Sequence, residues 1–315
     1  MKILLSLVFM CASLKAERVD LISGFSFPPR MLTLKAAGIA VRASNIDEYG
    51  KDLHLNSPDL KKIVFFRPCE NIFALSKLPK EKLVLFIWEA AELHPSTYDH
   101  YSRIYTWNDE LVDGVKFFKF YYPYLMPLRE DIPPFEEKKL CTMVASCLQG
   151  YTVNSLYPER IKMIEFFETK PEGDFEFYGF YWDRAKYKTY RGDIPGTVSD
   201  EPKLSVLKCY RFCICFENIK NAKGYITEKI FCCLAAGCIP IYWGASNVQE
   251  YIPKDCFIDY RDFRSKEELY KFIKTMPKHI YEGYINRIKE YLQSQKASLF
   301  SPEYFDQIFY EAVMH

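Results

Sequence analysis

Residues 210–237 constrain the fold of this chain more than any other segment. They open with an apolar run of strand length, residues 210–216, and close with a second apolar run, residues 230–236, that Gly237 ends. A polar loop joins the two runs, so the segment predicts a buried strand, a loop and a helix. The N-terminus of such a helix presents free backbone N–H groups, which bind anions.

The polar residues of this segment indicate a nucleotide-linked substrate. Lys229 lies in the predicted first turn of the helix, where the helix dipole disfavours a cation unless an anion such as phosphate faces it. Glu228 is suited to accept hydrogen bonds from ribose hydroxyls, because an ionised carboxylate only accepts; ordinary stabilisation of the first helical turn is the alternative. We also expect Glu217 and Asn218 to contact ribose or base, with a solvated loop as the alternative.

Arg160 adds a second indication of phosphate binding. It lies near the start of a predicted helix, residues 158–169, that follows a predicted strand. A guanidinium in that place can donate two parallel hydrogen bonds to phosphate oxygens. Many helix starts carry an arginine, so this indication is weak without the others.

The rest of the chain has the pattern of an α/β protein. Predicted strands occupy residues 19–22, 63–66, 83–88, 103–106, 139–146, 175–179, 238–244 and 256–260. Predicted helices occupy residues 31–43, 96–101, 158–169 and 204–209, followed by one that begins at Ser265.

A cluster of prolines at positions 127, 133 and 134 divides this pattern into two units. We predict domains at residues 1–130 and 139–276, and a helical tail at residues 277–315. Ligands bind beyond the carboxyl ends of strands in such sheets, so we expect a cleft between the two domains.

Composition excludes some classes of function. The chain is 49% hydrophobic and 17% aromatic, which supports packed cores, and its formal net charge is only +1, so we expect no nucleic-acid partner. No Asp-x-Asp pair, P-loop or G-x-G-x-x-G motif occurs. We therefore predict neither a metal ion nor a cofactor.

The first sixteen residues allow two interpretations. An apolar run, residues 3–14, follows Lys2 and precedes Ala16, which resembles a short secretory signal or a membrane anchor. A buried first strand of a parallel sheet has the same appearance.

Eleven cysteines bear on the compartment. Several lie in apolar runs, where cysteine behaves as a small hydrophobic residue, so we expect mostly free thiols in a reducing environment. A zinc site is the less favoured alternative, because the spacing of its candidate ligands is not that of a common zinc motif; these ligands are Cys213, Cys215, Cys232 and Cys233.

Residues 210–263 resemble the signature of glycosyltransferase family 10, the α-1,3-fucosyltransferases. The matching runs are residues 211–218, 224–230, 236–244 and 257–259. The resemblance implies a GT-B fold, in which two Rossmann-like domains face each other across a cleft. It also implies an inverting transfer of L-fucose from GDP-β-L-fucose to a hydroxyl of a glycan acceptor, commonly O3 of N-acetylglucosamine.

The same resemblance assigns roles to six residues. Glu89, which follows a predicted strand of the N-terminal domain, matches the carboxylate proposed as the general base, and Arg160 matches the arginine that contacts the diphosphate. The positions that match the donor-binding residues are Asn218, Tyr225, Glu228 and Lys229.

Two other functions and two compartments stay open. The chain is alternatively a related GT-B enzyme that uses another nucleotide sugar, or a non-catalytic binder of nucleotide or sugar. The signal-like N-terminus favours either an endomembrane, Golgi-type location or a membrane-associated cytoplasmic enzyme, and the cysteines favour the second.

Overall fold

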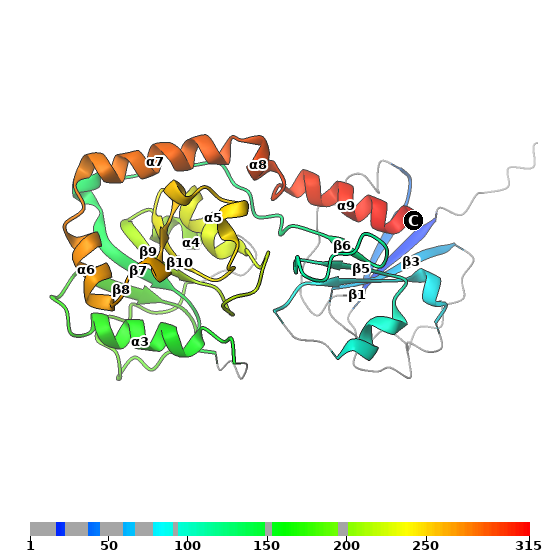
Figure 1. Ribbon diagram of the computed structural model, residues 1–315, viewed down its shortest axis with the longest axis horizontal. Helices are drawn as coiled ribbons and strands as arrows, with labels where there is room; N and C mark the ends of the chain where they lie inside the picture. Colours follow the sequence, from blue (N-terminus) through cyan, green and yellow to red (C-terminus); the bar gives the residue numbers. More distant parts are fainter. Residues whose placement is uncertain are drawn as a thin grey trace, which may run out of the picture.

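The computed structural model describes residues 17–22, 37–44, 59–66, 78–90, 94–148, 153–194 and 201–315. They form two α/β domains that lie side by side along the long axis of the molecule (Figure 1). Each domain holds one sheet, and every strand pair in both sheets is parallel. The two α/β units expected from the sequence are confirmed.

The N-terminal sheet has six strands in the order β2-β1-β3-β4-β5-β6. Their bounds are Arg18–Ile22 for β1, Ala40–Ser44 for β2, Leu60–Phe65 for β3, Leu83–Ile87 for β4, Arg103–Thr106 for β5 and Phe117–Lys119 for β6. Short 3-10 helices, η2 (Lys80–Lys82) and η3 (Pro95–His100), precede β4 and β5.

One predicted element of this domain is wrong. The helix expected over residues 31–43 does not extend through residues 40–43, which form β2 at the edge of the sheet; residues 31–36 lie outside the described residues. β2 pairs in parallel with β1, and the N–H of Ala40 donates to the carbonyl of Glu17 at 2.8 Å. Pairing with a neighbour distant in sequence decides this conformation, which local preference does not reveal.

Side chains alternate across the N-terminal sheet, as the period of a strand requires. Ile63 and Phe65 enter a core on one face, and Val64 and Phe66 enter a core on the other. Each face is therefore apolar and requires a covering layer.

The C-terminal sheet has five strands in the order β11-β10-β9-β7-β8. Their bounds are Lys139–Val144 for β7, Phe175–Tyr178 for β8, Tyr210–Phe216 for β9, Ile239–Trp243 for β10 and Ile258–Asp259 for β11. The helices of this domain are α3 (Tyr157–Phe167), α4 (Glu201–Leu207), α5 (Glu228–Ala235), α6 (Lys266–Lys274) and α7 (Lys278–Leu292). The predicted strand, loop and helix of residues 210–237 are confirmed as β9, its loop and α5.

The strand order places a topological switch point between β7 and β9. The chain passes from β7 outward to β8, and then returns to the other side of β7 to form β9. Connections leave the two strands in opposite directions there, which opens a crevice at their carboxyl ends where ligands bind in doubly wound folds.

The segment predicted as a helical tail is shared between the domains. Tyr281 and Ile288 of α7 belong to the C-terminal core. The chain then passes through α8 (Gln295–Ser298), and α9 (Pro302–Met314) lies on the N-terminal domain, where Phe305 and Phe309 enter the core that holds Val64 (Figure 1). The core of the N-terminal domain thus needs residues from both halves of the sequence.

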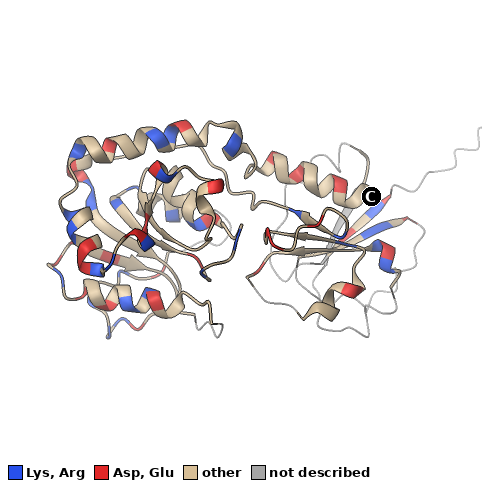
Figure 2. Ribbon diagram, viewed as in Figure 1, with Lys and Arg blue, Asp and Glu red and all other residues tan. Residues whose placement is uncertain are grey.

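Lys and Arg are interspersed with Asp and Glu over both domains (Figure 2). No helix within the described ranges is long and apolar enough to cross a membrane. Residues 1–16, to which the signal, anchor and first-strand interpretations apply, lie outside the described residues.

Replacing Phe309 with alanine should destabilise the protein by about 3–5 kcal/mol, because it empties a fully buried site. The ring lies 5.5 Å from that of Phe86 and 6.1 Å from that of Phe66, so α9 loses its anchor on the sheet. Urea unfolding followed by circular dichroism measures the change. Phe272→Ala on α6 is the control, since that ring is 39% exposed, and an equal loss in both variants would contradict this account.

Candidate active site

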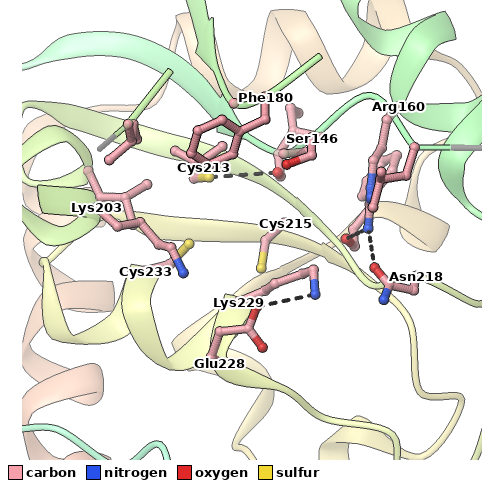
Figure 3. Close-up of a pocket in the computed structure, with 18 of the residues that line it drawn as sticks. Ser146, Arg160, Phe180, Lys203, Cys213, Cys215, Asn218, Glu228, Lys229 and Cys233 are labelled. Atoms are coloured by element: carbon pink, nitrogen blue, oxygen red, sulfur yellow. Dashed lines mark hydrogen bonds and ion pairs between the residues drawn. The ribbon is translucent and has the colours of Figure 1, made fainter. Parts of the chain in front are cut away.

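A cavity of about 380 Å³ opens at the switch point of the C-terminal sheet. Segments that follow β7, β8 and β9 line it together with α3, α4 and the first turn of α5 (Figure 3). Four of the six residues predicted for the site line this one cavity: Arg160, Asn218, Glu228 and Lys229. The sequence places the first of them far from the others, and the fold brings them together.

Arg160 is held rigidly at the end of β9. Its side chain is buried, and Nη2 donates to the carbonyl oxygens of Phe216 and Glu217, both at 2.8 Å, and to Oδ1 of Asn218 at 3.0 Å. The guanidinium also lies 4.5 Å from the ring centre of Tyr157, a cation–π distance. Burial lowers the pKa of Arg160, but an arginine remains charged at neutral pH.

Lys229 lines the cavity and also lies close to two carboxylates. Its Nζ lies 3.4 Å from Oε1 of Glu228 and 3.6 Å from Oε2 of Glu217. Burial lowers the pKa of Lys229, but the charges of Glu228 and Glu217 outweigh burial and raise it overall. The lysine is therefore a persistent cation, and these carboxylates compensate its unfavourable position in the helix dipole.

Glu228 is ionised in the same environment. Burial opposes the charge, but the cations of Lys229 and Lys203 outweigh it and lower the pKa of Glu228 to about 2. The cavity thus holds fixed positive charge on either side of a carboxylate that only accepts hydrogen bonds. This arrangement suits a ligand with both an anionic group and hydroxyl donors.

Glu217 does not line the cavity, contrary to the expectation that it contacts ribose or base. Its side chain is fully buried and accepts hydrogen bonds from the N–H of Thr227 at 2.9 Å and from its Oγ1 at 2.7 Å. Thr227 is the N-cap of α5, so Glu217 fixes the start of that helix. The interpretation that Glu217 contacts ribose or base is wrong, whereas Asn218 beside it lines the cavity.

Tyr225 lies between the cavity and the N-terminal domain. Its buried ring is 4.8 Å from that of Trp107 and 6.0 Å from that of Tyr122, both in the N-terminal domain. Its hydroxyl oxygen lies 3.5 Å from Nδ2 of the cavity residue Asn218. The structure therefore places Tyr225 at the contact between the domains, and its contact with a donor stays a prediction.

Glu89 lies on the N-terminal side of that contact. It is exposed and follows β4 by two residues, at the carboxyl end of the sheet. Burial raises the pKa of Tyr225, and the charges of Glu217 and Glu228 from one domain and Glu89 from the other raise it further. The carboxylate of Glu89 is thus near the loop between β9 and α5, residues 217–227, which we call the donor loop after its predicted role. It does not line the cavity, and its role as a base stays a prediction.

Other lining residues were not singled out from the sequence. Ser146 ends a predicted strand and Tyr157 directly precedes a predicted helix, so their positions could be found in that way. Lys203 gives no local signal, because only the packing of α4 against α5 brings it near Glu228. The remaining lining residues include three of the buried cysteines, namely Cys213, Cys215 and Cys233.

The nine cysteines in the described part of the chain are free thiols, and seven of them are buried. Burial raises the pKa of Cys215. No cluster of three or more His, Cys, Asp or Glu residues in the described ranges could hold a metal ion.

Comparison with known proteins gives a family match in the C-terminal half. Residues 175–305 match the family model described as "Glycosyltransferase family 10 (fucosyltransferase) C-term". The 4-galactosyl-N-acetylglucosaminide 3-alpha-L-fucosyltransferase 9 of Mus musculus is 30% identical over 162 residues, which are 50% of this chain and 39% of that protein. The alpha-(1,4)-fucosyltransferase of Arabidopsis thaliana is 42% identical over 67 residues, 21% of this chain and 16% of that protein. The chain thus aligns with well under half the length of these relatives.

Solved structures share the whole fold. A crystal structure of an alpha1,3-fucosyltransferase matches 96% of this chain and 92% of its own with a TM-score of 0.60 and 14% identity. A DNA-modifying beta-glucosyltransferase matches 95% of this chain and all of its own with a TM-score of 0.54 and 11% identity. At these identities the likeness concerns the fold alone, and it confirms the predicted GT-B architecture of two Rossmann-like domains.

Replacing Glu217 with glutamine should change how stability depends on pH. Burial raises the pKa of Glu217 above its usual value near 4.5, so the native protein binds more protons than the unfolded chain as the pH rises past that value. Stability conferred by this group therefore falls with rising pH, and Glu217→Gln removes that trend. The free energy of unfolding of the variant, relative to wild type, should increase between pH 4.5 and pH 7.5 in urea titrations.

Glu282→Gln on the exposed face of α7 is the matched control for this measurement. Parallel curves for wild type and Glu217→Gln would show that the buried carboxylate does not titrate in this way.

Proposed function

We propose that the protein is an inverting α-1,3-fucosyltransferase, and that residues 175–305, which match the glycosyltransferase family 10 model, are its donor-binding domain. It transfers L-fucose from GDP-β-L-fucose to a hydroxyl of a glycan acceptor, commonly O3 of N-acetylglucosamine. The observation that supports this most is the convergence of Arg160, Asn218, Glu228 and Lys229 on one cavity at the switch point of the C-terminal sheet.

The charges of the cavity suit a GDP-sugar. The cations of Arg160 and Lys229 and the free N–H groups at the start of α5 would bind the diphosphate. Glu228, ionised at neutral pH, would accept hydrogen bonds from ribose hydroxyls. These cations neutralise a diphosphate directly, so we propose that the donor binds without a metal clamp or a cofactor.

Transfer proceeds by direct displacement at the anomeric carbon. The carboxylate of Glu89 takes the proton of the acceptor hydroxyl, the acceptor oxygen bonds to the anomeric carbon, and the bond from that carbon to the diphosphate breaks. Negative charge grows on the departing GDP, so cations fixed there bind the transition state more strongly than the ground state. Glu89 belongs to the other domain, from which it can approach the opposite face of the sugar.

A transfer assay with GDP-fucose and an N-acetyllactosamine-type acceptor tests the proposal. Competition among GDP-fucose and other nucleotide sugars separates it from a related enzyme with another donor. Binding of GDP without transfer to any acceptor would instead favour the non-catalytic binder. The compartment, membrane-associated cytoplasmic or endomembrane, stays a prediction that sequencing of the mature N-terminus tests.

Lys229→Ala should weaken GDP binding at least about tenfold, because it removes a charge-assisted contact with the diphosphate. Isothermal titration with GDP measures the dissociation constant. Lys223→Ala is the control, since that lysine lies in the loop just before α5 but outside the cavity, half-exposed and paired with Glu110 at 3.1 Å. Equal affinities in the two variants would remove Lys229 from the donor site.

Glu89→Gln should reduce kcat by about 10²–10⁴-fold, the usual contribution of a general base, while GDP affinity remains within about twofold of wild type. The amide keeps the size of the side chain but cannot accept the acceptor's proton. Steady-state kinetics and GDP titration measure the two effects separately. Glu81→Gln, at the opposite end of β4, is the control, and full turnover in Glu89→Gln would refute its assignment as the base.

A further inference from the structure

Two buried aromatic side chains hold the backbone that carries Glu89. The hydroxyl of Tyr122 donates a hydrogen bond to the carbonyl oxygen of Trp88, and Nε1 of Trp107 donates to the carbonyl oxygen of Glu89 at 3.3 Å. Both donors come from segments that follow β5 and β6. These side chains therefore hold the turn beyond β4, where no strand among the described residues pairs with it.

The same two rings contact the donor loop. Tyr225 lies with its ring 4.8 Å from Trp107, at an interplanar angle of 62°, and 6.0 Å from Tyr122, at 82°. Such edge-to-face contacts have a preferred geometry. Tyr225 in turn lies beside Asn218, which lines the cavity, so the two rings connect the turn that carries Glu89 to the cavity wall.

Trp107 is itself fixed within the N-terminal domain and lies close to the loop that precedes α5. Its carbonyl oxygen accepts a hydrogen bond from Nζ of Lys119 at 2.5 Å, and Lys119 pairs with Asp109 at 2.6 Å. Gly224 packs closely there: with φ of +81°, a Cβ on it would lie 2.3 Å from the Trp107 carbonyl oxygen. The absence of a side chain at Gly224 thus permits the close approach of the donor loop to Trp107.

Asp109 extends this connection to the segment after β10. Its Oδ2 accepts hydrogen bonds from Nδ2 of Asn247 at 2.8 Å and from the hydroxyl of Tyr251 at 2.7 Å. Oδ1 of Asn247 accepts the N–H of Gly224 at 2.9 Å, so the donor loop and Asp109 share one partner. The position of Trp107 relative to the donor loop is therefore defined by polar contacts on several sides.

We propose that Tyr122 and Trp107 are positioning residues, which set the place of the Glu89 carboxylate relative to the donor loop. This inference rests on the proposed function, in which Glu89 takes the proton of the acceptor. A general base must lie within hydrogen-bond reach of that proton, and a displacement of about 1 Å can cost about 10²-fold in rate. Neither side chain touches the donor cavity, so they act on turnover rather than on donor binding.

Tyr105 provides a matched control. It is 4% exposed, against 3% for Tyr122, and belongs to the same aromatic cluster, with its ring stacked on that of Phe86 at 4.6 Å. Its hydroxyl interacts electrostatically with Arg103 and not with the turn that carries Glu89. Removal of either hydroxyl leaves the ring in the core, so the two variants differ mainly in their effect on that turn.

The test compares Tyr122→Phe, Trp107→Phe and Tyr105→Phe in the full-length protein. We expect kcat to fall at least about tenfold in the first two, with donor KM and the GDP dissociation constant within about twofold of wild type. Tyr105→Phe should keep kcat within about twofold while it loses thermal stability to an extent similar to Tyr122→Phe. Equal kcat values in Tyr122→Phe and Tyr105→Phe, or a loss confined to donor KM, would overturn the inference.

Hydrogen exchange keeps this test independent of the proposed function. The amides of residues 88–90 should exchange faster in Tyr122→Phe and Trp107→Phe than in Tyr105→Phe, whether or not the wild type transfers fucose. Absence of transfer by the wild type, with this difference in exchange, would refute the proposed function and support the positioning of the turn. Equal exchange in all three variants would refute the positioning itself.

Discussion

The buried carboxylate of Glu217 accepts two hydrogen bonds from Thr227, and this contact joins the end of β9 to the start of α5. Removing a carboxylate from water costs free energy that hydrogen bonds and a nearby cation offset. Thr227 donates the hydrogen bonds, and Lys229 is the nearby cation. Between Glu217 and Thr227 lies the loop that presents Asn218 to the cavity and Tyr225 to the N-terminal domain. The position of Asn218 in the cavity and the contact of Tyr225 with the N-terminal domain therefore both depend on this one loop, whose two ends Glu217 and Thr227 join.

The two domains contribute differently to the proposed reaction. The C-terminal domain holds fixed charges of both signs, and Lys229 and Arg160 line one cavity, where they would stabilise a departing anion. The N-terminal domain would contribute the carboxylate of Glu89, on a turn whose backbone carbonyls accept hydrogen bonds from Tyr122 and Trp107. In the first domain, backbone carbonyls and neighbouring charges position the side chains of the cavity. In the second, hydrogen bonds from two buried aromatic side chains position the turn that carries Glu89.

The sequence predicted the local elements best where strand and helix follow each other directly. The apolar runs within residues 210–237 correspond to β9 and α5. Contacts between distant segments could not be predicted, because the apolar residues of α9 suit any apolar surface and nothing in them specifies the N-terminal sheet. For the same reason the local sequence of residues 40–43 does not reveal that they form β2. Glu217 shows a further limit, since sequence does not tell a buried acid from an exposed one.

Through α8 and α9 the chain passes back from the C-terminal domain to the N-terminal domain, and this path determines where dyes must be placed to observe motion between the domains. Two segments cross between the domains, and they are joined where the N–H of Leu125 donates to the carbonyl of Phe300 at 2.8 Å. A fluorophore attached after α9 would travel with the N-terminal domain, because that helix is packed into its core. Energy transfer to a second dye on η3 would then stay constant during any rotation of one domain against the other. A dye on α6, paired with the same C-terminal label, would report the rotation.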